Sequence, residues 1–221
     1  MPSRWPSISA EHPPGGAAVH DVRLASPADL PALERALGLA FADDPVWSFA
    51  LRPARRLPER IGTFSGIVAR IHLSHGSVWV TKDGSAAAIW GPPKLWRVEP
   101  RQFLRYGLRA ARAAGPRSLP TLAAVGEVEK HHPSGEHWYL AVLGTEPSAQ
   151  GQGRGSALLR PMLERCDLDG LGAYLESSKE SNIAFYARHG FEVTESFDLP
   201  RGGPRLWSMW RDPRPPDGVS S

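Results

Sequence analysis

The succession of strand and helix patterns along the chain constrains the fold more than any other feature of the sequence. Apolar residues that alternate predict strands, and apolar residues three and four positions apart predict helices. Between residues 22 and 210 these patterns follow the order β-α-α-β-β-α-α-β-α-β-α-β-β. Strands that alternate with helices, with two hairpins among them, predict an α/β (α+β) fold: a mixed, mostly antiparallel central sheet with helices on both faces.

The expected elements have the following bounds. Strands are expected at 22–24, 77–81, 86–90, 137–144, 171–176, 191–197 and 205–210. The first helix is expected to begin after the capping residue Ser26 and to end at Asp43-Asp44-Pro45, because proline does not continue a helix. Further helices are expected at 58–73, 96–113, 119–130, 156–165 and 182–189.

Glycine and proline are abundant, with 22 of each in 221 residues, and many of them lie at the two ends of the chain. Residues 1–19 and 212–221 contain neither a helical nor a strand period, which predicts two disordered tails. The residues between them, 20–211, are predicted to form one domain. A domain of that length buries a sizeable core without disulfides.

Composition argues against several classes of protein. No apolar run approaches the roughly 20 residues of a membrane span, and the first residues lack the pattern of a secretion signal. The single cysteine, Cys166, excludes an internal disulfide and a cysteine-based zinc site, so no metal site is expected. The net charge is +3 and the arginines are scattered, which argues against nucleic-acid binding. We therefore expect a cytoplasmic protein that binds neither membranes nor nucleic acid.

A glycine-rich loop between an expected strand and an expected helix is the most informative local feature. Gly151, Gly153 and Gly155 stand at every second position of the segment Gln150–Ser156. Glycines let the backbone approach a ligand and direct several N–H groups into one concavity, to which the next helix adds the positive end of its dipole. The loop therefore predicts a site for a phosphate or pyrophosphate, with Arg154 as a further positive charge.

Other interpretations of the loop were compared with this one. A Walker A loop would require a lysine before its helix, whereas this loop ends Arg154-Gly155-Ser156. The dinucleotide fingerprint would require a third glycine at the position of Ser156 and a continuing parallel βαβ unit. A tight loop that binds nothing is the remaining alternative, and the three glycines alone do not distinguish it from an anion site.

Further motifs surround the loop in a fixed order. Thr145-x-Pro147 precedes it, and Asn182-x-x-Phe185-Tyr186-x-x-x-Gly190-Phe191 follows it. Together they resemble the signature of the GNAT superfamily of acyl-CoA-dependent N-acyltransferases, and the resemblance extends over residues 20–211. It is closest to the puromycin N-acetyltransferase-like members of that family. The supporting segments are Phe41–Pro45, Val78–Val80, Ala88–Trp90, His131-x-Pro133, Trp138, Leu175–Ser178 and Arg205–Trp207.

The resemblance implies the GNAT acyl-CoA N-acyltransferase fold and acetyl-CoA as the cosubstrate. In that family the strand that ends near Gly144 separates from its neighbour, and the pantetheine arm pairs with the exposed backbone as an added strand. A backbone N–H near Leu143 polarises the thioester carbonyl. The coenzyme-binding residues that the resemblance implies are Leu143, Gly144, Thr145, Gln150, Gly151, Gln152, Gly153, Arg154, Gly155, Ser156, Asn182 and Tyr186.

The resemblance also implies roles for two residues of the Asn-x-x-Phe-Tyr motif. Tyr186 matches the family's acid, which returns a proton to the coenzyme thiolate. The alternative for Tyr186 is a buried aromatic residue beside Phe185. Asn182 is expected to bond the pantetheine arm, to cap the helix at 182–189, or to do both.

Glu176 is the leading candidate base. It is a carboxylate in an otherwise apolar strand, and a buried acid needs a partner, which suits a general base or an anchor for the substrate amine. A structural partner for an arginine is an equally open interpretation. Glu127, Glu129, His131 and His137 precede the central strand and could also reach the acceptor, although each is more typical of a solvated helix end or loop. Asp43 and Asp44 could bind a cationic amine, but as a pair that ends a helix they are expected in a surface turn. Cys166 is expected to pack in the core.

The sequence therefore predicts an acyl-CoA-dependent N-acetyltransferase. It is expected to transfer an acetyl group from acetyl-CoA to a primary amine of a small molecule by direct attack on the thioester. The alternative is a catalytically silent acyl-CoA-binding or regulatory module of the same fold. A monomer and a homodimer are both compatible with the sequence.

Overall fold

The computed structural model describes residues 21–51, 55–97, 102, 105–115 and 118–214. The expected tail at 1–19 and all but the first residues of the tail at 212–221 lie outside these ranges. Arg214 is described, and its backbone N–H donates to a carboxylate oxygen of Asp167 at 2.7 Å. The proposed domain boundaries stay a prediction.

A seven-stranded sheet with the order β1-β2-β3-β4-β5-β7-β6 forms the centre of the molecule. Its strands are β1 (Val22–Leu24), β2 (Val78–Thr81), β3 (Ala86–Gly91), β4 (His137–Thr145), β5 (Gly172–Ser177), β6 (Glu192–Asp198) and β7 (Arg205–Arg211). The β4–β5 pair is parallel and every other neighbouring pair is antiparallel. The predicted mixed, mostly antiparallel sheet is confirmed.

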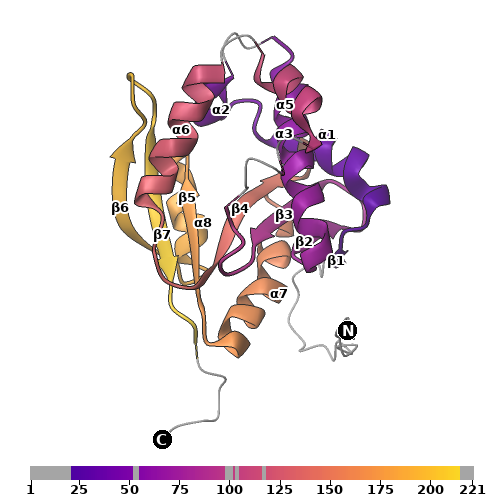
Figure 1. Ribbon diagram of the computed structural model, residues 1–221. Helices are drawn as coiled ribbons and strands as arrows, with labels where there is room; N and C mark the ends of the chain where they lie inside the picture. Colours follow the sequence, from indigo (N-terminus) through magenta and orange to yellow (C-terminus); the bar gives the residue numbers. More distant parts are fainter. Residues whose placement is uncertain (1–20, 52–54, 98–101, 103–104, 116–117, 215–221) are drawn as a thin grey trace, which may run out of the picture.

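Helices cover both faces of this sheet (Figure 1). The α-helices are α1 (Leu30–Ala40), α2 (Pro45–Ala50), α3 (Leu57–His72), α5 (Gly107–Ala114), α6 (Ser118–His131), α7 (Arg154–Asp169) and α8 (Ile183–Ala187). Apolar residues of α7, among them Leu158, Leu159 and Met162, pack on one face. Residues of α1 and α3, among them Leu33 and Leu37, pack on the other. In Figure 1, α6 runs beside β6 and β7.

Glycines allow α1 and α3 to lie unusually close together. A Cβ atom added to Gly38 would clash with the carbonyl oxygen of Pro58, and one added to Gly62 would clash with the carbonyl oxygen of Glu34. The two helices therefore meet backbone to backbone at these positions. The contact fixes the end of α1, and the turn that follows it, against the sheet.

The sheet opens between β4 and β5. The parallel pairing includes three residues of β4, the last pair being Tyr139 with Tyr174, although β4 continues to Thr145 and β5 to Ser177. On its other side β4 stays paired with β3 up to Thr145, but Ile89 faces Val142 while Trp90 faces Leu140. One extra residue in β4 bends the strand at this point. The separation that the family resemblance implies is therefore present.

Two expected helices differ from the structure. The segment after Asp44 forms α2, because Asp44 caps a new helix with Pro45 at its first position. The helix expected at 96–113 is wrong at its start, because Trp96 and Arg97 are not helical. Residues 98–101 and 103–104 lie outside the described ranges, Gln102 is helical, and α5 covers Gly107–Ala114. Among the described residues, no helix is long and apolar enough to cross a membrane.

Candidate functional site

A cavity of about 680 Å³ lies where the glycine loop meets the opening in the sheet. Its walls come from the end of α1 with the following turn, the end of β4, the loop between β4 and α7, and the segment around α8. Of the predicted coenzyme-binding residues, those that line it are Leu143, Gly144, Thr145, Gln150, Gly151, Gly153, Arg154, Gly155, Ser156, Asn182 and Tyr186. Gln152 is not among the lining residues; its amide reaches back to the carbonyl oxygen of Ser148 at 3.4 Å.

The glycine loop has a backbone that only glycine adopts readily. Gly151 and Gly153 have φ angles of 73° and 83°, in the left-handed region. A Cβ atom added to Gly151 would point into open space. The loop leads directly into α7, which begins at Arg154, so the first N–H groups of a 16-residue helix border the cavity. This geometry is that of an anion site at a helix N-terminus.

Arg154 braces the loop from within. Its guanidinium donates to Asp83 at 2.8 Å, to the carbonyl oxygen of Ala149 and to the side chain of Gln152. Hydrogen bonds from Thr81, then Ser85, then Arg154 hold the pKa of Asp83 well below its usual value. The expected free positive charge is therefore paired with an acid in this structure.

Asp44 is buried, and the expectation of a surface turn is wrong for this residue. Its Oδ1 accepts hydrogen bonds from the backbone N–H groups of Val46 and Trp47, at 2.9 and 3.0 Å, which caps α2. Its Oδ2 accepts from the hydroxyl of Ser178. Burial raises its pKa. Asp43, in contrast, stays largely exposed and pairs with Lys179.

Tyr186 and Asn182 both border the cavity. The Tyr186 ring packs edge-on against Phe185 and Phe191, so it is a buried aromatic residue as well as a cavity residue. Burial, and then the nearby charge of Asp44, raises its pKa, which keeps the hydroxyl protonated and able to donate. Asn182 occupies the cap position of α8 but its side chain makes no capping hydrogen bond. The side chain of Asn182 therefore does not cap this helix in the structure.

Glu176 lies on the sheet face opposite α7 and does not line the described cavity. Its side chain is 5% exposed. The Tyr139 hydroxyl donates to its Oε2 at 2.8 Å, and Nδ1 of His132 lies 3.6 Å from its Oε1. Its partners among the described residues are therefore a tyrosine and a histidine, and not the arginine of the alternative interpretation.

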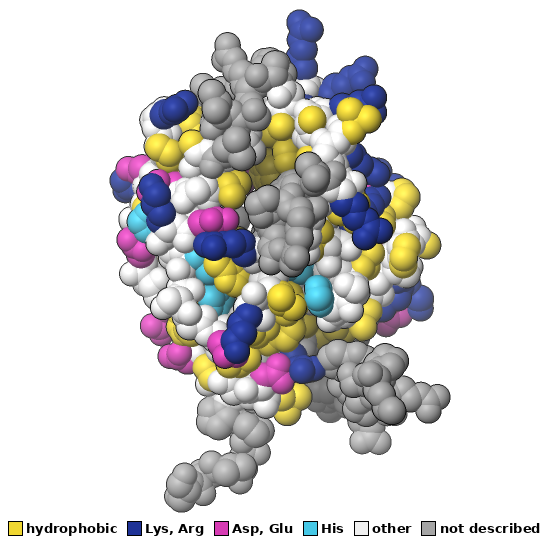
Figure 2. Space-filling model, in the orientation of Figure 1, with side chains coloured by type: hydrophobic (Ala, Val, Ile, Leu, Met, Phe, Trp, Pro, Cys, Tyr) yellow, Lys and Arg dark blue, Asp and Glu magenta, His cyan; other side chains and the backbone are white. Residues whose placement is uncertain are grey.

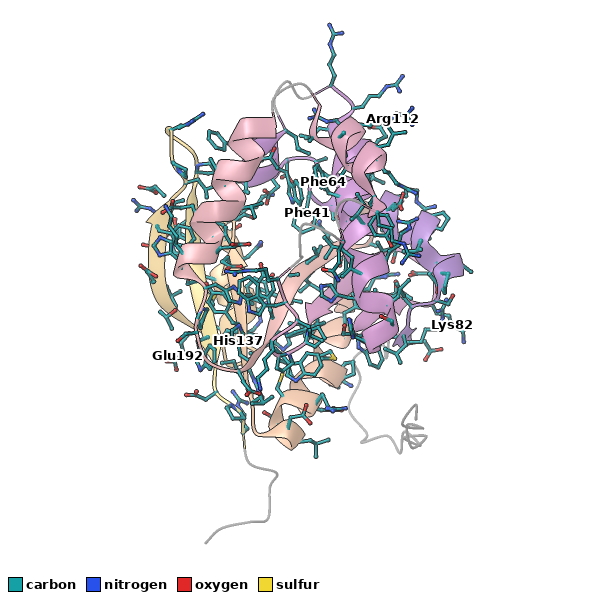
Figure 3. All side chains as sticks on the ribbon, viewed as in Figure 1. Phe41, Phe64, Lys82, Arg112, His137 and Glu192 are labelled. Carbon is teal, nitrogen blue, oxygen red and sulfur yellow. The ribbon has the colours of Figure 1, made fainter. Side chains whose placement is uncertain are left out.

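Aromatic rings surround this acid. Trp96 stacks on His132 with ring centroids 3.4 Å apart, and His137 lies within hydrogen-bonding distance of His132. Figure 3 shows His137 on the sheet below α6, with Phe41 and Phe64 on the side of α3. In Figure 2 hydrophobic side chains gather toward the middle of this face, with histidine side chains beside them. Sequence reasoning missed His132 and Tyr139 as partners of Glu176, because their proximity depends on tertiary structure.

The remaining predicted core residue behaves as expected. Cys166 is fully buried among apolar side chains. Burial raises the pKa of its thiol to about 12, so it is an unreactive packing residue. Among the described residues, no group of three His, Cys, Asp or Glu side chains is placed to hold a metal ion.

Known proteins share both the fold and part of the sequence. A family model described as an acetyltransferase (GNAT) domain matches residues 121–193, from α6 through the glycine loop to the start of β6. An uncharacterised N-acetyltransferase of Schizosaccharomyces pombe is 27% identical over 191 residues, which cover 79% of this chain and 76% of that protein.

Solved structures extend the likeness to most of the chain. A Corynebacterium glutamicum protein described as histone acetyltransferase HPA2 and related acetyltransferase is 25% identical, with a TM-score of 0.64 over 90% of this chain and 99% of the other. A polyamine N-acetyltransferase of Drosophila melanogaster shares the fold at 15% identity, with a TM-score of 0.62 over 87% and 99% of the two chains.

The fold, in which the sheet opens after three parallel pairs beside a glycine loop and a helix N-terminus, is shared with these acetyltransferases. Residues 121–193 match a GNAT acetyltransferase domain, and together with the curated relative and the solved structures this match supports a GNAT N-acetyltransferase, which is an acyltransferase. Its resemblance to puromycin N-acetyltransferase-like members in particular stays a prediction.

Proposed function

We propose that the protein transfers an acetyl group from acetyl-CoA to a primary amine of a small molecule. The observation that carries this proposal is the position of the cavity, which joins the glycine loop to the unpaired part of β4. A long ligand with an anionic end and an extended arm fits such a cavity. Coenzyme A has that form, with a pyrophosphate at one end and a pantetheine arm.

The residues present suit such a ligand. The pyrophosphate would lie on the backbone N–H groups between Gly151 and Ser156, where open space faces the loop and the positive end of α7 points outward. The pantetheine arm would run along Leu143, Gly144 and Thr145, whose β5 side pairs with no strand in the part of the chain that the structure describes. A Cβ atom at Gly144 would lie within 3 Å of the side chains of Leu37 and Ala40. Glycine at this position therefore allows the end of α1 to pack closely against β4 at the cavity wall.

The chemistry needs little from the protein beyond position and proton transfer. A neutral amine held against the thioester attacks the carbonyl carbon directly, and the backbone N–H near Leu143 stabilises the developing oxyanion. The departing thiolate, whose parent thiol has a pKa of about 8.5, takes a proton from Tyr186. A phenol is protonated near neutral pH, and burial, then the charge of Asp44, raises the pKa of Tyr186 further.

Glu176 is the proposed base for the amine. It follows Tyr174, the last residue of β5 that pairs with β4, by two positions, so it stands where the strands have separated. It also lies on the face of the sheet opposite α7. The acceptor class is supported by the names of two structural neighbours, a polyamine N-acetyltransferase and an agmatine N-acetyltransferase.

Thiol release tests this proposal. The full chain is incubated with acetyl-CoA and a panel of polyamines, agmatine, arylalkylamines and aminonucleosides, and free thiol is measured with a chromogenic disulfide. We expect release that depends on one class of amine and on enzyme concentration. Binding of acetyl-CoA without release by any amine would favour the silent acyl-CoA-binding module, and absence of binding would contradict both.

A further inference from the structure

Two polar atoms of the described residues lack a hydrogen-bond partner in the interior beside the opening in the sheet. They are Oε1 of Glu176 and Nδ1 of His132, which lie 3.6 Å apart. Both side chains are almost entirely shielded from solvent. Buried polar groups are nearly always paired, so two unsatisfied atoms that face each other require a physical explanation.

The neighbouring histidine fixes where hydrogen atoms lie. Nδ1 of His137 is 2.7 Å from the carbonyl oxygen of Gly135, an acceptor, so this nitrogen carries the hydrogen. Burial lowers the pKa of His137, which keeps the ring neutral and leaves its Nε2 a bare acceptor. That Nε2 is 2.9 Å from Nε2 of His132. His132 must therefore donate from Nε2.

The remaining nitrogen of His132 faces the acid. If His132 were neutral, its Nδ1 would be a second bare acceptor opposite the carboxylate of Glu176. An unpaired negative charge would then be buried, which is costly. A proton on Nδ1 converts His132 to an imidazolium and pairs the two groups. Tyr139 donates to the other carboxylate oxygen, and such hydrogen bonds are strongest to an ionised acceptor.

Among the described residues, the surroundings supply no other compensating charge for Glu176. Burial raises the pKa of both Tyr139 and Tyr174, so both rings stay neutral. The face of Trp96 covers His132, an arrangement that favours a cation. The other ionisable groups around the cluster have partners of their own: His131 pairs with Glu127 and Glu195, and Arg97 pairs with Glu129.

We propose that His132 is a positioning residue for acetyl transfer: as an imidazolium it keeps Glu176 ionised and ready to take a proton from the attacking amine. The inference rests on the proposed function, in which Glu176 is the base. Without the imidazolium, the buried carboxylate of Glu176 would take a proton from solvent. The resulting neutral carboxylic acid could not accept the proton of the attacking amine. In the reaction one proton moves from the amine nitrogen to Glu176 and then to solvent, while the His132 proton stays on its ring.

The protonation of His132 can be measured without turnover. ¹⁵N-resolved NMR of the histidine rings is recorded on the full chain near neutral pH, and the His132 signals are assigned by their loss in His132→Gln. We expect both ring nitrogens of His132 to be protonated and His137 to carry its hydrogen on Nδ1. In Glu176→Gln the charge is gone, so His132 becomes neutral with its hydrogen on Nε2. A neutral His132 in the wild-type protein overturns the proposal.

The pH dependence of kcat/KM for the amine tests the role itself. In His132→Gln we expect the acidic limb to move to higher pH by about one unit or more, with an unchanged Kd for acetyl-CoA. The matched control is His131→Gln, the adjacent histidine, which pairs with Glu195 and stacks on Phe197. In the control the limb stays in place. A folded His132→Gln protein whose limb does not move contradicts the proposal.

A failure of the proposed function has a separate signature. Wild-type protein that transfers acetyl to no amine would remove the base role of Glu176, and the positioning role of His132 with it. The NMR spectra would still report whether the buried pair is ionised. Loss of the ion pair with normal acetyl transfer would instead remove the positioning role and leave the proposed function intact.

Discussion

The Tyr186 side chain combines a buried ring with a hydroxyl group that borders the cavity. In Tyr186→Phe we expect kcat to fall by about 100-fold, because the thiolate loses its proton donor. The Kd for acetyl-CoA should change little, since the ring and its packing remain. Stopped-flow thiol release and isothermal titration measure the two quantities. Tyr106→Phe, whose residue is not a cavity residue, serves as the control, and full activity of Tyr186→Phe would exclude Tyr186 as the acid.

His72 is a buried histidine in α3 whose two ring nitrogens have no hydrogen-bond partner among the described residues. Burial, and then the charge of His75, lowers its pKa to about 4. In the unfolded chain the pKa is about 6.5. Because the unfolded state binds the proton more readily, the contribution of neutral His72 to stability is complete above about pH 6.5 and is lost as the pH falls toward 4.

The size of this effect can be measured by urea unfolding at two pH values. Between pH 7 and pH 5 we expect His72 alone to lower the free energy of unfolding by about 2 kcal/mol. His72→Phe should lack that part of the pH dependence, while His75→Gln, at an exposed position, should retain most of it. Equal pH dependence of wild type and His72→Phe would show that His72 does not carry the effect.

The contact between α1 and α3 depends on glycine at the crossing point. Gly62→Ala places a methyl group against the backbone carbonyl of Glu34, and backbone has no rotamer by which to move away. We expect a loss of about 1–3 kcal/mol in the free energy of unfolding, measured by urea titration. Gly126→Ala in α6 is the control, because a Cβ atom there meets nothing within 4 Å. This substitution should raise the free energy of unfolding by about 0.5–1 kcal/mol. If both substitutions raise the free energy of unfolding, the contact between α1 and α3 does not depend on glycine at position 62.

Most elements were predictable because their signals are local. Alternating apolar residues predicted all seven strands to within a few positions, and Gly151, Gly153 and Gly155 predicted the loop and the helix behind it. The start of α2 was missed because Asp44-Pro45 was interpreted as the end of a helix. The same pair is also the signature of a helix start, and here one helix ends just before the next begins.

The partners of Glu176 were not predictable from the sequence. A buried acid in an apolar strand signals that a partner exists, but it does not say which one. His132 and Tyr139 reach Glu176 because the parallel β4–β5 pairing brings strands of distant sequence side by side. The start of the helix expected from Trp96 is wrong for a related reason, since Trp96 stacks on His132 and tertiary contact overrides local helix propensity.

Residues from both halves of the chain line the cavity. The stability of the whole molecule therefore depends on the concentration of a ligand that binds there. At 100 times its Kd, acetyl-CoA should stabilise the protein by about 2.7 kcal/mol. For a chain of this size that raises Tm by roughly 5–10 °C. Differential scanning fluorimetry with increasing acetyl-CoA measures the shift.

A matched pair of variants shows whether the shift comes from the glycine loop. Asparagine and aspartate both tolerate the left-handed backbone of Gly151, and a side chain there enters open space. Gly151→Asn should keep much of the thermal shift. Gly151→Asp should abolish it, because a carboxylate repels the pyrophosphate. A shift that survives in Gly151→Asp would place the anion elsewhere.

The early end of the β4–β5 pairing gives this sheet a third edge, inside the sheet rather than at its border. From Leu140 to Thr145, the β5 side of β4 offers backbone groups that no described strand satisfies. Any edge of that kind accepts an extended segment from another chain and is a starting point for aggregation. A ligand arm that pairs with β4 therefore shields this edge from other chains in addition to carrying the reacting group. Protein purified and stored with the coenzyme should stay monodisperse longer than protein without it.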